Sequence, residues 1–203
     1  TGQGNPFSVF TPYKRRWVEN FDMTFLDIAK VSKPKRPSSI RSDLSALKFV
    51  KTHSASIDLW PAGESAAQEK LANFLQSKVN TYSESRNSPI IDGTSRISPY
   101  IALGILSPKR CILEGLKLND FEFTSGNKGI CKWIDEIVWR EFYRNIMHSF
   151  PKVSMNQPFQ EYTKSIQWRH SSEELEAFYA GRTGFPIVDA GIRQMLAEGW
   201  MHN

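Results

Sequence analysis

The sequence predicts an all-α protein, and three observations favour that class. Apolar residues recur at every third or fourth position in several long stretches, which is the spacing of one helix face. Ser-Pro and Thr-Pro pairs, which are typical of helix starts, stand before some of these stretches. Strand signals are nearly absent. With 203 residues, of which 40% are hydrophobic and 12% aromatic, the chain is long enough to bury a core.

Charge and composition exclude several classes of function. The net charge is +5, and nine Lys or Arg against four Asp or Glu in residues 1–50 account for all of the excess. The basic residues between positions 30 and 36 stand among Pro and Ser, which favours a solvated linker over a nucleic-acid patch. No apolar run reaches about 18 residues, so we expect a cytoplasmic protein with no membrane partner. The two Cys and four His lack metal-ligand spacing, and no metal site is expected.

Residues 1–62 are expected to be an interdomain linker with short helices. The first residue is Thr and not Met, so we expect a processed chain or a part of a longer one. Thr11-Pro12 forms an N-cap followed by Pro at the first helical position, which predicts a short helix with Trp17 and Phe21 on one side. From 31 to 60 the chain is rich in Ser, Pro and Lys with weak periodicity, which indicates a long connection carrying one short helix.

The domain proper is expected to occupy residues 63–203 and to open with a helix from 64 to 79. A hydroxyl-rich loop follows and ends in Ser98-Pro99, again an N-cap and N1 pair. Thr94, Ser95 and Arg96 would then stand at a helix N-terminus, where phosphate binds readily. Plain capping explains the same residues equally well, so both interpretations stay open. A second pair, Ser107-Pro108, predicts a structural helix through Leu116.

The stretch 130–147 is predicted to be the central helix, and it carries two sets of residues. The first set is an apolar stripe, and the second set lies beside this stripe at helical spacing. Taken alone, this second set is explained by Trp packing in the core and by a Glu136–Arg140 pair four residues apart. The apolar stripe consists of Ile130, Ile134, Ile137, Val138, Phe142 and Ile146, and the second set of Trp133, Glu136, Trp139, Arg140 and Tyr143.

The last fifty residues are predicted to form a loop and two helices. Residues 151–158 are expected to form the loop, and Trp168 follows in an extended or turn setting, where a core, surface or redox role is equally open. Ser171 and Glu174 form a capping box that opens a helix to about position 179. Pro186 starts the last helix, along which Asp189 and Arg193 are expected to pair. Gly199 is expected to end it as the C′ glycine.

Four motifs occur together and in order: the central helix, Gly93-Thr94-Ser95-Arg96, Thr183-Gly184-Phe185-Pro186-Ile187-Val188-Asp189-Ala190 and Gly199-Trp200-Met201-His202-Asn203. This combination resembles the photolyase and cryptochrome family, and specifically its bacterial members that repair cyclobutane pyrimidine dimers. The resemblance extends along essentially the whole chain. It implies that the chain is the interdomain linker plus the first half of the helical FAD-binding domain.

The resemblance also implies a role for individual residues. Family members hold a U-shaped FAD, whose phosphates would be lined by Tyr82, Thr94, Ser95, Arg96, Ile97 and Ser98. Trp133 would form part of the cavity wall, Arg140 its mouth, and Asn203 would lie near the flavin ring nitrogens. Glu136 would hydrogen-bond the lesion's bases, Trp139 would pack on the flipped-out dimer and Arg86 would meet the DNA. Trp168 would be the outermost tryptophan of the chain that photoreduces the flavin. The catalytic set implied is thus Glu136, Trp139 and Trp168, and the DNA-binding set Arg86, Glu136, Trp139, Arg140 and Asn203.

Three alternatives share some of these features. Plant cryptochromes, which signal without repairing DNA, typically lack the Trp at Trp139 and have Asp where Asn203 stands. Six-four photolyases usually carry Gln in place of Glu136 and His in place of Asn203. A flavin-free helical DNA-binding module would leave the clustered Trp and Glu unexplained. The residues present therefore favour dimer repair.

The resemblance further implies a set of partners. FAD is the expected cofactor, although the chain alone is expected to bind it weakly or not at all and to be inactive. An antenna chromophore is expected in a preceding domain, and Ser154 and Met155 stand where some relatives contact a folate, so no folate is predicted here. Damaged DNA is the expected partner. The full-length enzyme is expected to be a monomer, whereas the chain alone would expose apolar surface and self-associate.

Overall fold

The computed structural model describes residues 4–27 and 57–203. Within these ranges every regular element is a helix, which confirms the all-α class. The expectations for residues 31–56, including the solvated linker around positions 30–36, lie outside the described residues. The α-helices are α1 (Phe10–Glu19), α2 (Glu64–Ser77), α3 (Tyr82–Ser85), α4 (Ser98–Ala102), α5 (Pro108–Lys117), α6 (Lys128–Ser149), α7 (Ser172–Tyr179) and α8 (Pro186–Glu198). The 3₁₀ turns are η1 (Met23–Leu26), η3 (Ile57–Leu59), η4 (Val79–Thr81), η5 (Pro151–Met155) and η6 (Glu161–Ser165).

The chain divides into two compact units. The first unit consists of residues 1–28 and 62–168, and the second of residues 29–61 and 169–203. The first unit therefore holds α1 to α6, and the second holds α7 and α8. The sequence-based boundary between residues 62 and 63 stays a prediction.

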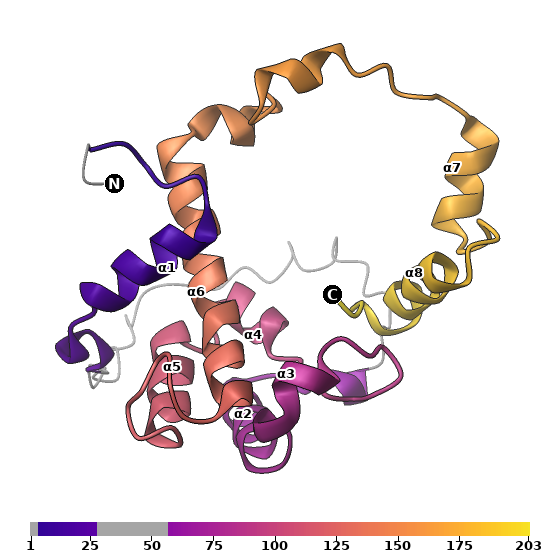
Figure 1. Ribbon diagram of the computed structural model, residues 1–203. Coiled ribbons are helices and arrows are strands. Elements are labelled where there is room, and N and C mark those ends of the chain that lie inside the picture. The colour runs from indigo at the N-terminus through magenta and orange to yellow at the C-terminus, as the bar shows by residue number, and fades with distance from the viewer. Residues whose placement is uncertain (1–3, 28–56) are drawn as a thin grey trace, which may run out of the picture. The chain divides into compact units, whose positions relative to one another are not determined.

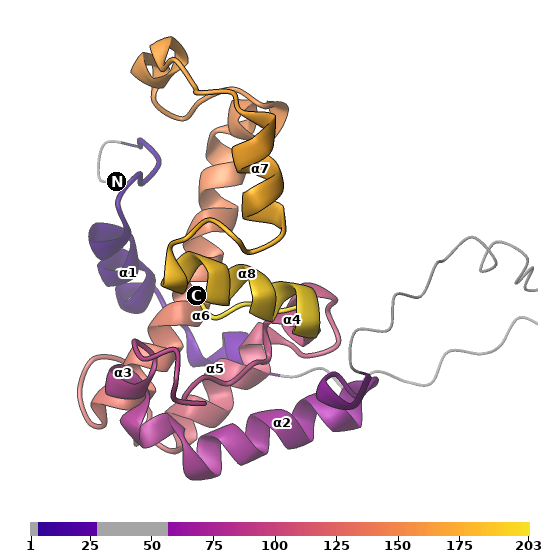
Figure 2. The same cartoon turned by 90° about the vertical axis from the view of Figure 1, so that its right-hand side faces the viewer.

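The long helix α6 is the axis of the first unit, with α1 along one side and the shorter helices around its N-terminal half (Figures 1 and 2). It begins where Asn127 caps it, because the Asn127 side chain accepts hydrogen bonds from the backbone N–H groups of Gly129 and Ile130. Its apolar stripe is buried as predicted, from Ile130 to Phe142. The helix is longer than the predicted 130–147 by two residues at each end.

Small residues let neighbouring elements approach α6 closely. A Cβ atom at Gly129 would lie 2.1 Å from the carbonyl oxygen of Val79 in η4, so only glycine fits there. At Gly115 on α5, a Cβ would lie 3.1 Å from the Trp133 ring. Trp133 itself is only 2% exposed and its ring centroid lies 5.3 Å from that of Phe74 on α2. These contacts fasten α2, η4 and α5 to the N-terminal half of α6.

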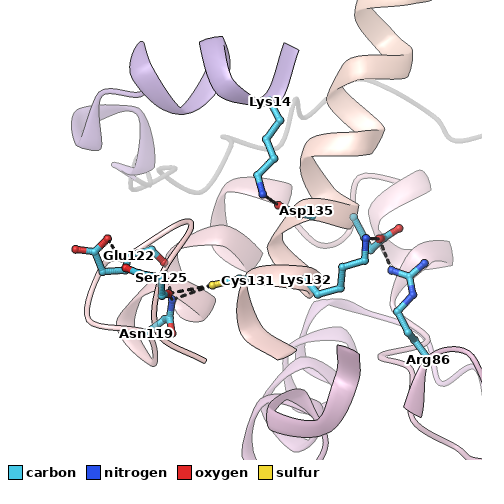
Figure 3. A network of polar contacts seen from close by, with 9 residues as sticks. Lys14, Arg86, Asn119, Glu122, Ser125, Cys131, Lys132 and Asp135 are labelled. Atoms are coloured by element: carbon cyan, nitrogen blue, oxygen red, sulfur yellow. Dashed lines mark hydrogen bonds and ion pairs between the residues drawn. The ribbon is translucent and has the colours of Figure 1, made fainter. Parts of the chain in front are cut away.

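Helix α1 is attached to α6 by charge and by aromatic packing. The ammonium group of Lys14 lies 2.6 Å from the Asp135 carboxylate (Figure 3). The rings of Phe10 and Tyr13 both pack on Phe142, with centroids 5.8 and 5.2 Å from it. The helix begins at Phe10, whereas the sequence predicted Thr11 as its cap. That prediction was wrong because Val9 takes the extended N-cap position, so the helix includes Phe10.

A tight loop leads into α6, and one side chain organises it. The Asn119 amide donates to the carbonyl oxygens of Glu122 and Ser125, and its oxygen accepts from the Asn127 backbone N–H at 2.7 Å (Figure 3). The Cys131 thiol donates to the Ser125 carbonyl oxygen. Asn119 is buried, and these bonds satisfy it. The loop thus fixes the point at which α6 starts.

The second unit shows the predicted capping signals at both helices. The Ser171 hydroxyl accepts from the Glu174 backbone N–H, which confirms that half of the capping box, but the Glu174 carboxylate pairs with Arg169 instead of the cap N–H. Gly199 ends α8 with a φ of 66°, as predicted. The expected pairing of Asp189 with Arg193 was wrong as a direct contact. The Asp189 carboxylate accepts three hydrogen bonds, from Thr183 and Gly184.

The remaining differences concern short elements. Residues 151–158, predicted as a loop, contain the 3₁₀ turn η5. Helix α4 begins at Ser98 itself with Ile97 in the N-cap position, so the prediction of Ser98 as the cap was one residue late. Ser107 does occupy the N-cap position of α5, although its side chain makes no cap hydrogen bond. None of the described helices is long and apolar enough to cross a membrane.

Candidate functional site

An ion-pair cluster joins α3 to α6 at the centre of the predicted site. The Arg86 guanidinium pairs with the Glu136 carboxylate, and the Lys132 ammonium lies 3.4 Å from the same carboxylate (Figure 3). Both cations contact Oε1, and no described residue is paired with Oε2. Glu136 therefore pairs with Arg86 and Lys132, and the Glu136–Arg140 pair expected from spacing is absent among the described residues. The cluster leaves one carboxylate oxygen for a ligand.

Tyr82 completes this cluster from the first turn of α3. Its ring lies under Arg86, with the guanidinium carbon 5.5 Å from the ring centroid, a cation–π contact. Burial raises the pKa of the Tyr82 hydroxyl to about 12, the positive charge of Arg86 opposes that shift and the negative charge of Glu136 adds to it. The hydroxyl therefore stays protonated at neutral pH, and the ring provides a packing surface for Arg86 and Phe74.

Trp139 lies one turn further along α6 and has an aromatic neighbour on its face. The Phe10 ring stacks on the indole with a centroid distance of 3.6 Å and an interplanar angle of 9°. Phe142 meets the indole edge-on and Tyr143 stacks at 5.6 Å. Trp139 is half-buried in this group. The contacts fix the orientation of the indole plane, and the Phe10 ring covers one of its faces.

The predicted phosphate loop runs from Gly93 to Ser98 and lies against α3. A Cβ at Gly93 would lie 2.4 Å from the Ser85 hydroxyl oxygen, so the close approach of loop and helix depends on this glycine. Arg96 adopts a φ of 49°, a left-handed conformation that is costly for a residue other than Gly. Such strain is typical of loops held in one shape for a ligand.

Two cations contact the Asp92 carboxylate beside this loop, and the charge of a third, Lys70, acts on it. Lys78 lies 2.6 Å and Arg96 3.2 Å from the Asp92 carboxylate. Burial of Asp92 opposes its ionisation, but the Lys78 hydrogen bond and the charges of Lys78, Arg96 and Lys70 outweigh it and lower its pKa. Burial and the repulsion of Arg96 and Lys78 lower the pKa of Lys70, although Asp92 opposes this. That an anion binds at this loop stays a prediction.

If an anion binds here, the cationic side chains near Asp92 would attract it more than a helix dipole would. Helix α4 has only five residues, too few for the strong N-terminal field that the sequence argument assumed. Sequence reasoning missed Lys70, Lys78 and Asp92. The signal was faint, because the contact between Lys78 and Asp92 joins a helix end to a loop 14 residues later. Nothing in the local pattern pairs those two positions.

The remaining predicted site residues are divided between the two units. Trp133 belongs to the core beside Phe74, so its contact with flavin stays a prediction. Trp168 is 73% exposed at the end of the first unit, and Asn203 lies in the second unit after α8. Around the loop, Thr94 and Ser95 are half-buried, Ile97 is buried, Ser98 is exposed, and Arg140 lies half-buried on the α1 side of α6. No described His, Cys, Asp or Glu side chains form a group of three or more that could hold a metal.

A family model described as the FAD binding domain of DNA photolyase matches residues 133–203. Over its full length the chain is 34% identical to the Escherichia coli deoxyribodipyrimidine photo-lyase. The chain belongs to the DNA photolyase and cryptochrome family. It spans 43% of the length of that relative, and it covers 35% of the Neurospora crassa deoxyribodipyrimidine photo-lyase, to which it is 33% identical.

Solved photolyase structures agree with this assignment. The bacterial class III photolyase from Agrobacterium tumefaciens aligns with all of this chain and 42% of its own, with 31% identity and a TM-score of 0.86. A Synechocystis cryptochrome aligns with 70% of this chain and 29% of its own, with 29% identity and a TM-score of 0.62. The photolyase match thus extends over the α2–α6 core and the α1 segment alike.

Proposed function

We propose that this chain forms part of a light-driven DNA repair enzyme that splits cyclobutane pyrimidine dimers. The observation that carries the proposal is the arrangement on α6. Glu136 presents an unpaired carboxylate oxygen and, one turn later, Trp139 presents an indole of fixed orientation. A carboxylate for base N–H groups beside an aromatic surface for base faces is the chemistry that recognises a flipped nucleobase. The names of the photolyase relatives agree with this substrate.

Trp139 and Arg86 would bind the damaged strand. A dimer inside a duplex is out of reach and must be flipped out, and this costs least for a lesion that already stacks poorly. The Trp139 indole would then stack on the flipped dimer, and such stacking contributes about 1–3 kcal/mol per base. Arg86 would contact a phosphate and so position the strand without reading its sequence.

Glu136 would act on the lesion itself. The oxygen Oε2 would accept a hydrogen bond from a base N–H, while Arg86 and Lys132 hold Oε1 and fix the carboxylate. Because the two cations hold the carboxylate in one orientation, the acceptor is in place before the dimer arrives. Hydrogen bonds to a charged acceptor are stronger than neutral ones. The carboxylate thereby holds the base in the position that the reaction needs.

The loop at Gly93–Ser98 would hold the FAD phosphates. Lys70, Lys78 and Arg96 place three positive charges near Asp92, and such a cluster of cations would attract a diphosphate. Thr94, Ser95 and Ser98 add hydroxyl donors along the same loop. Bound in its reduced form, FAD would supply an electron to the dimer on illumination and receive it back. The protein's own task there is to bind and orient the cofactor.

The exposed Trp168 would serve as the outer member of an electron path. Its 73% exposure leaves the indole in contact with solvent, where an external reductant can reach it. Arg140 and Asn203 are proposed to border the cofactor, as the resemblance implies. The antenna chromophore is proposed to bind to a part of the protein outside this chain. We also propose that the protein is located where the DNA is, which in a bacterium is the cytoplasm.

The proposal extends to oligomeric state. The second unit leaves Phe185, Ile187 and Leu196 exposed, and exposed apolar side chains promote association where they gather into a patch. We therefore propose that the chain self-associates by itself and that the full-length enzyme is a monomer. Sedimentation velocity over a concentration range distinguishes the two states.

The Synechocystis cryptochrome neighbour favours one alternative, a flavin-binding blue-light receptor without repair activity. The deciding experiment gives the full-length protein, loaded with reduced FAD, a duplex with one thymine dimer in blue light and in the dark. We expect light-dependent loss of the dimer, and a large reduction in dimers repaired per absorbed photon for Glu136→Gln. Glu141→Gln, on the same helix, is the control and should retain activity. Flavin retention without any repair would instead support the receptor.

A further inference from the structure

A pocket of about 600 Å³ lies in the first unit, between α1, η1, α5 and α6. This volume is within the range of about 300–1,000 Å³ that small-molecule sites occupy. Of the residues discussed for flavin or DNA, only Arg140 lines it. The helices that form it are held together by the Lys14–Asp135 ion pair and by the rings of α1 packed on α6. The pocket is therefore a built feature of the unit.

Most of the pocket wall is aromatic or aliphatic. The rings of Trp17 and Phe21 pack against each other with centroids 4.7 Å apart, and Phe123 meets both from behind. Phe25, although it lines the pocket, is 62% exposed. The apolar lining consists of Phe7, Tyr13, Trp17, Phe21, Phe25, Leu26, Ile112, Ile137 and Val138. Walls of this kind take a flat aromatic ring.

Two of the cations that line the pocket have no carboxylate partner among the described residues. Arg16 pairs with Glu19 and Arg144 with Glu141, so these charges are balanced. The carboxylate of Asp22 accepts from the Thr24 backbone N–H and hydroxyl.

The two unbalanced charges are Arg140 on α6 and Lys109 on α5. The Lys109 ammonium lies 4.4 Å from the centroid of the Phe25 ring, which places a positive charge directly on the aromatic wall. The pocket thus combines apolar walls with two cations from different helices.

We propose that this pocket binds a planar aromatic molecule that carries a carboxylate or a similar anionic group. The aromatic walls supply contact area for the ring, and Lys109 and Arg140 supply charge-assisted hydrogen bonds to the anion. The site uses the α1 side of α6, whereas the proposed flavin phosphates use the loop before α4. Arg140 is the one lining residue that is also proposed to border the flavin, so the test below measures ligand binding and not repair.

The test measures binding of 2-naphthoate and of its neutral analogue 2-naphthamide to the purified full-length protein by titration calorimetry. We expect one-to-one binding of the acid and binding of the amide that is roughly tenfold weaker, because the amide lacks the charge. Lys109→Gln and Arg140→Gln should each weaken binding of the acid by roughly tenfold and leave binding of the amide unchanged. Thermal unfolding checks that each variant folds. Because Lys109 is exposed, Lys109→Gln should fold and still tests the proposal if Arg140→Gln does not fold.

The matched control is Lys117→Gln, because Lys117 is an exposed lysine of α5 that pairs with Glu114 and does not line the pocket. It should bind both probes as the parent protein does. No saturable binding, equal affinity for acid and amide, or an equal loss in the control would each overturn the proposal.

Discussion

Replacing Trp139 with Ala gives the sharpest test of the lesion platform. The indole is stacked on Phe10 with a centroid distance of 3.6 Å, so its plane is fixed before DNA binds. Removing it takes away the stacking surface for a flipped base but leaves the charges of Arg86 and Glu136 in place. We therefore expect binding of dimer-containing DNA to weaken and binding of undamaged DNA to change little.

The magnitude follows from the stacking energy. A base stacked on an aromatic ring contributes about 1–3 kcal/mol, and each 1.4 kcal/mol is about a factor of ten in affinity. The expected loss for dimer-containing DNA is thus about 5- to 150-fold. The substitution also removes the aromatic pair with Phe10, which contributes about 0.5–1.5 kcal/mol to folding. This stability cost must be measured separately.

Phe10→Ala is the matched control because it removes the same aromatic pair from the other side. It should lose a similar amount of folding free energy, measured by urea unfolding, but much less affinity for damaged DNA. Affinities are measured by fluorescence anisotropy on one duplex with and without a single thymine dimer. Equal losses on the two duplexes for Trp139→Ala, or equal losses for both variants, would refute the stacking role.

Three further predictions concern the charges and the loop. Arg86→Ala should lower the slope of log affinity against log salt by about 0.9, the value for one phosphate contact, while Arg110→Ala, which breaks another Arg–Glu pair, should leave it unchanged. Gly93→Ala should weaken FAD binding by roughly tenfold or more, because its Cβ would meet the Ser85 hydroxyl, and Ser85→Gly in the same chain should restore binding. Tyr82 has a folded pKa of about 12, above the value of about 10 expected when unfolded, so its contribution to stability is complete below about pH 10 and is lost as the pH rises towards 12. Tyr82→Phe should therefore lose less stability than the parent over that range, as measured by urea unfolding, and an identical decline would contradict the raised pKa.

Helical periodicity and capping residues predicted the fold well where local chemistry decides it. The stripe from Ile130 to Phe142, the Ser171 cap and the Gly199 terminus depend on neighbours within a few positions, and all three were confirmed. The start of α1 was missed because a tertiary contact decides it. Phe10 is drawn into the helix and packs on Trp139, a residue 129 positions away, and no local pattern contains that information.

In the candidate site, too, features set by neighbours in the sequence were predicted, and features set by tertiary contacts were missed. Spacing on one helix places Glu136 and Trp139 one turn apart on α6, but the partners of Glu136 could not be chosen from spacing. Arg140 stands at the ideal spacing, yet Arg86, the residue that follows α3, pairs with the carboxylate because α3 packs against α6. The Lys78–Asp92 pair was missed for the same reason. Long-range packing, rather than residue type, decides which charges meet.

The most direct test of the central claim is the visible absorption spectrum of the purified full-length protein after incubation with FAD and desalting, for the parent and for Arg96→Ala. The account predicts that the parent retains one flavin per protein and that the variant loses most of it, because a guanidinium beside the phosphates is gone. Lys117→Gln, with an equal loss of charge elsewhere, should retain flavin. If the parent retains no flavin, or if Arg96→Ala retains as much as the parent, the proposed cofactor site is contradicted.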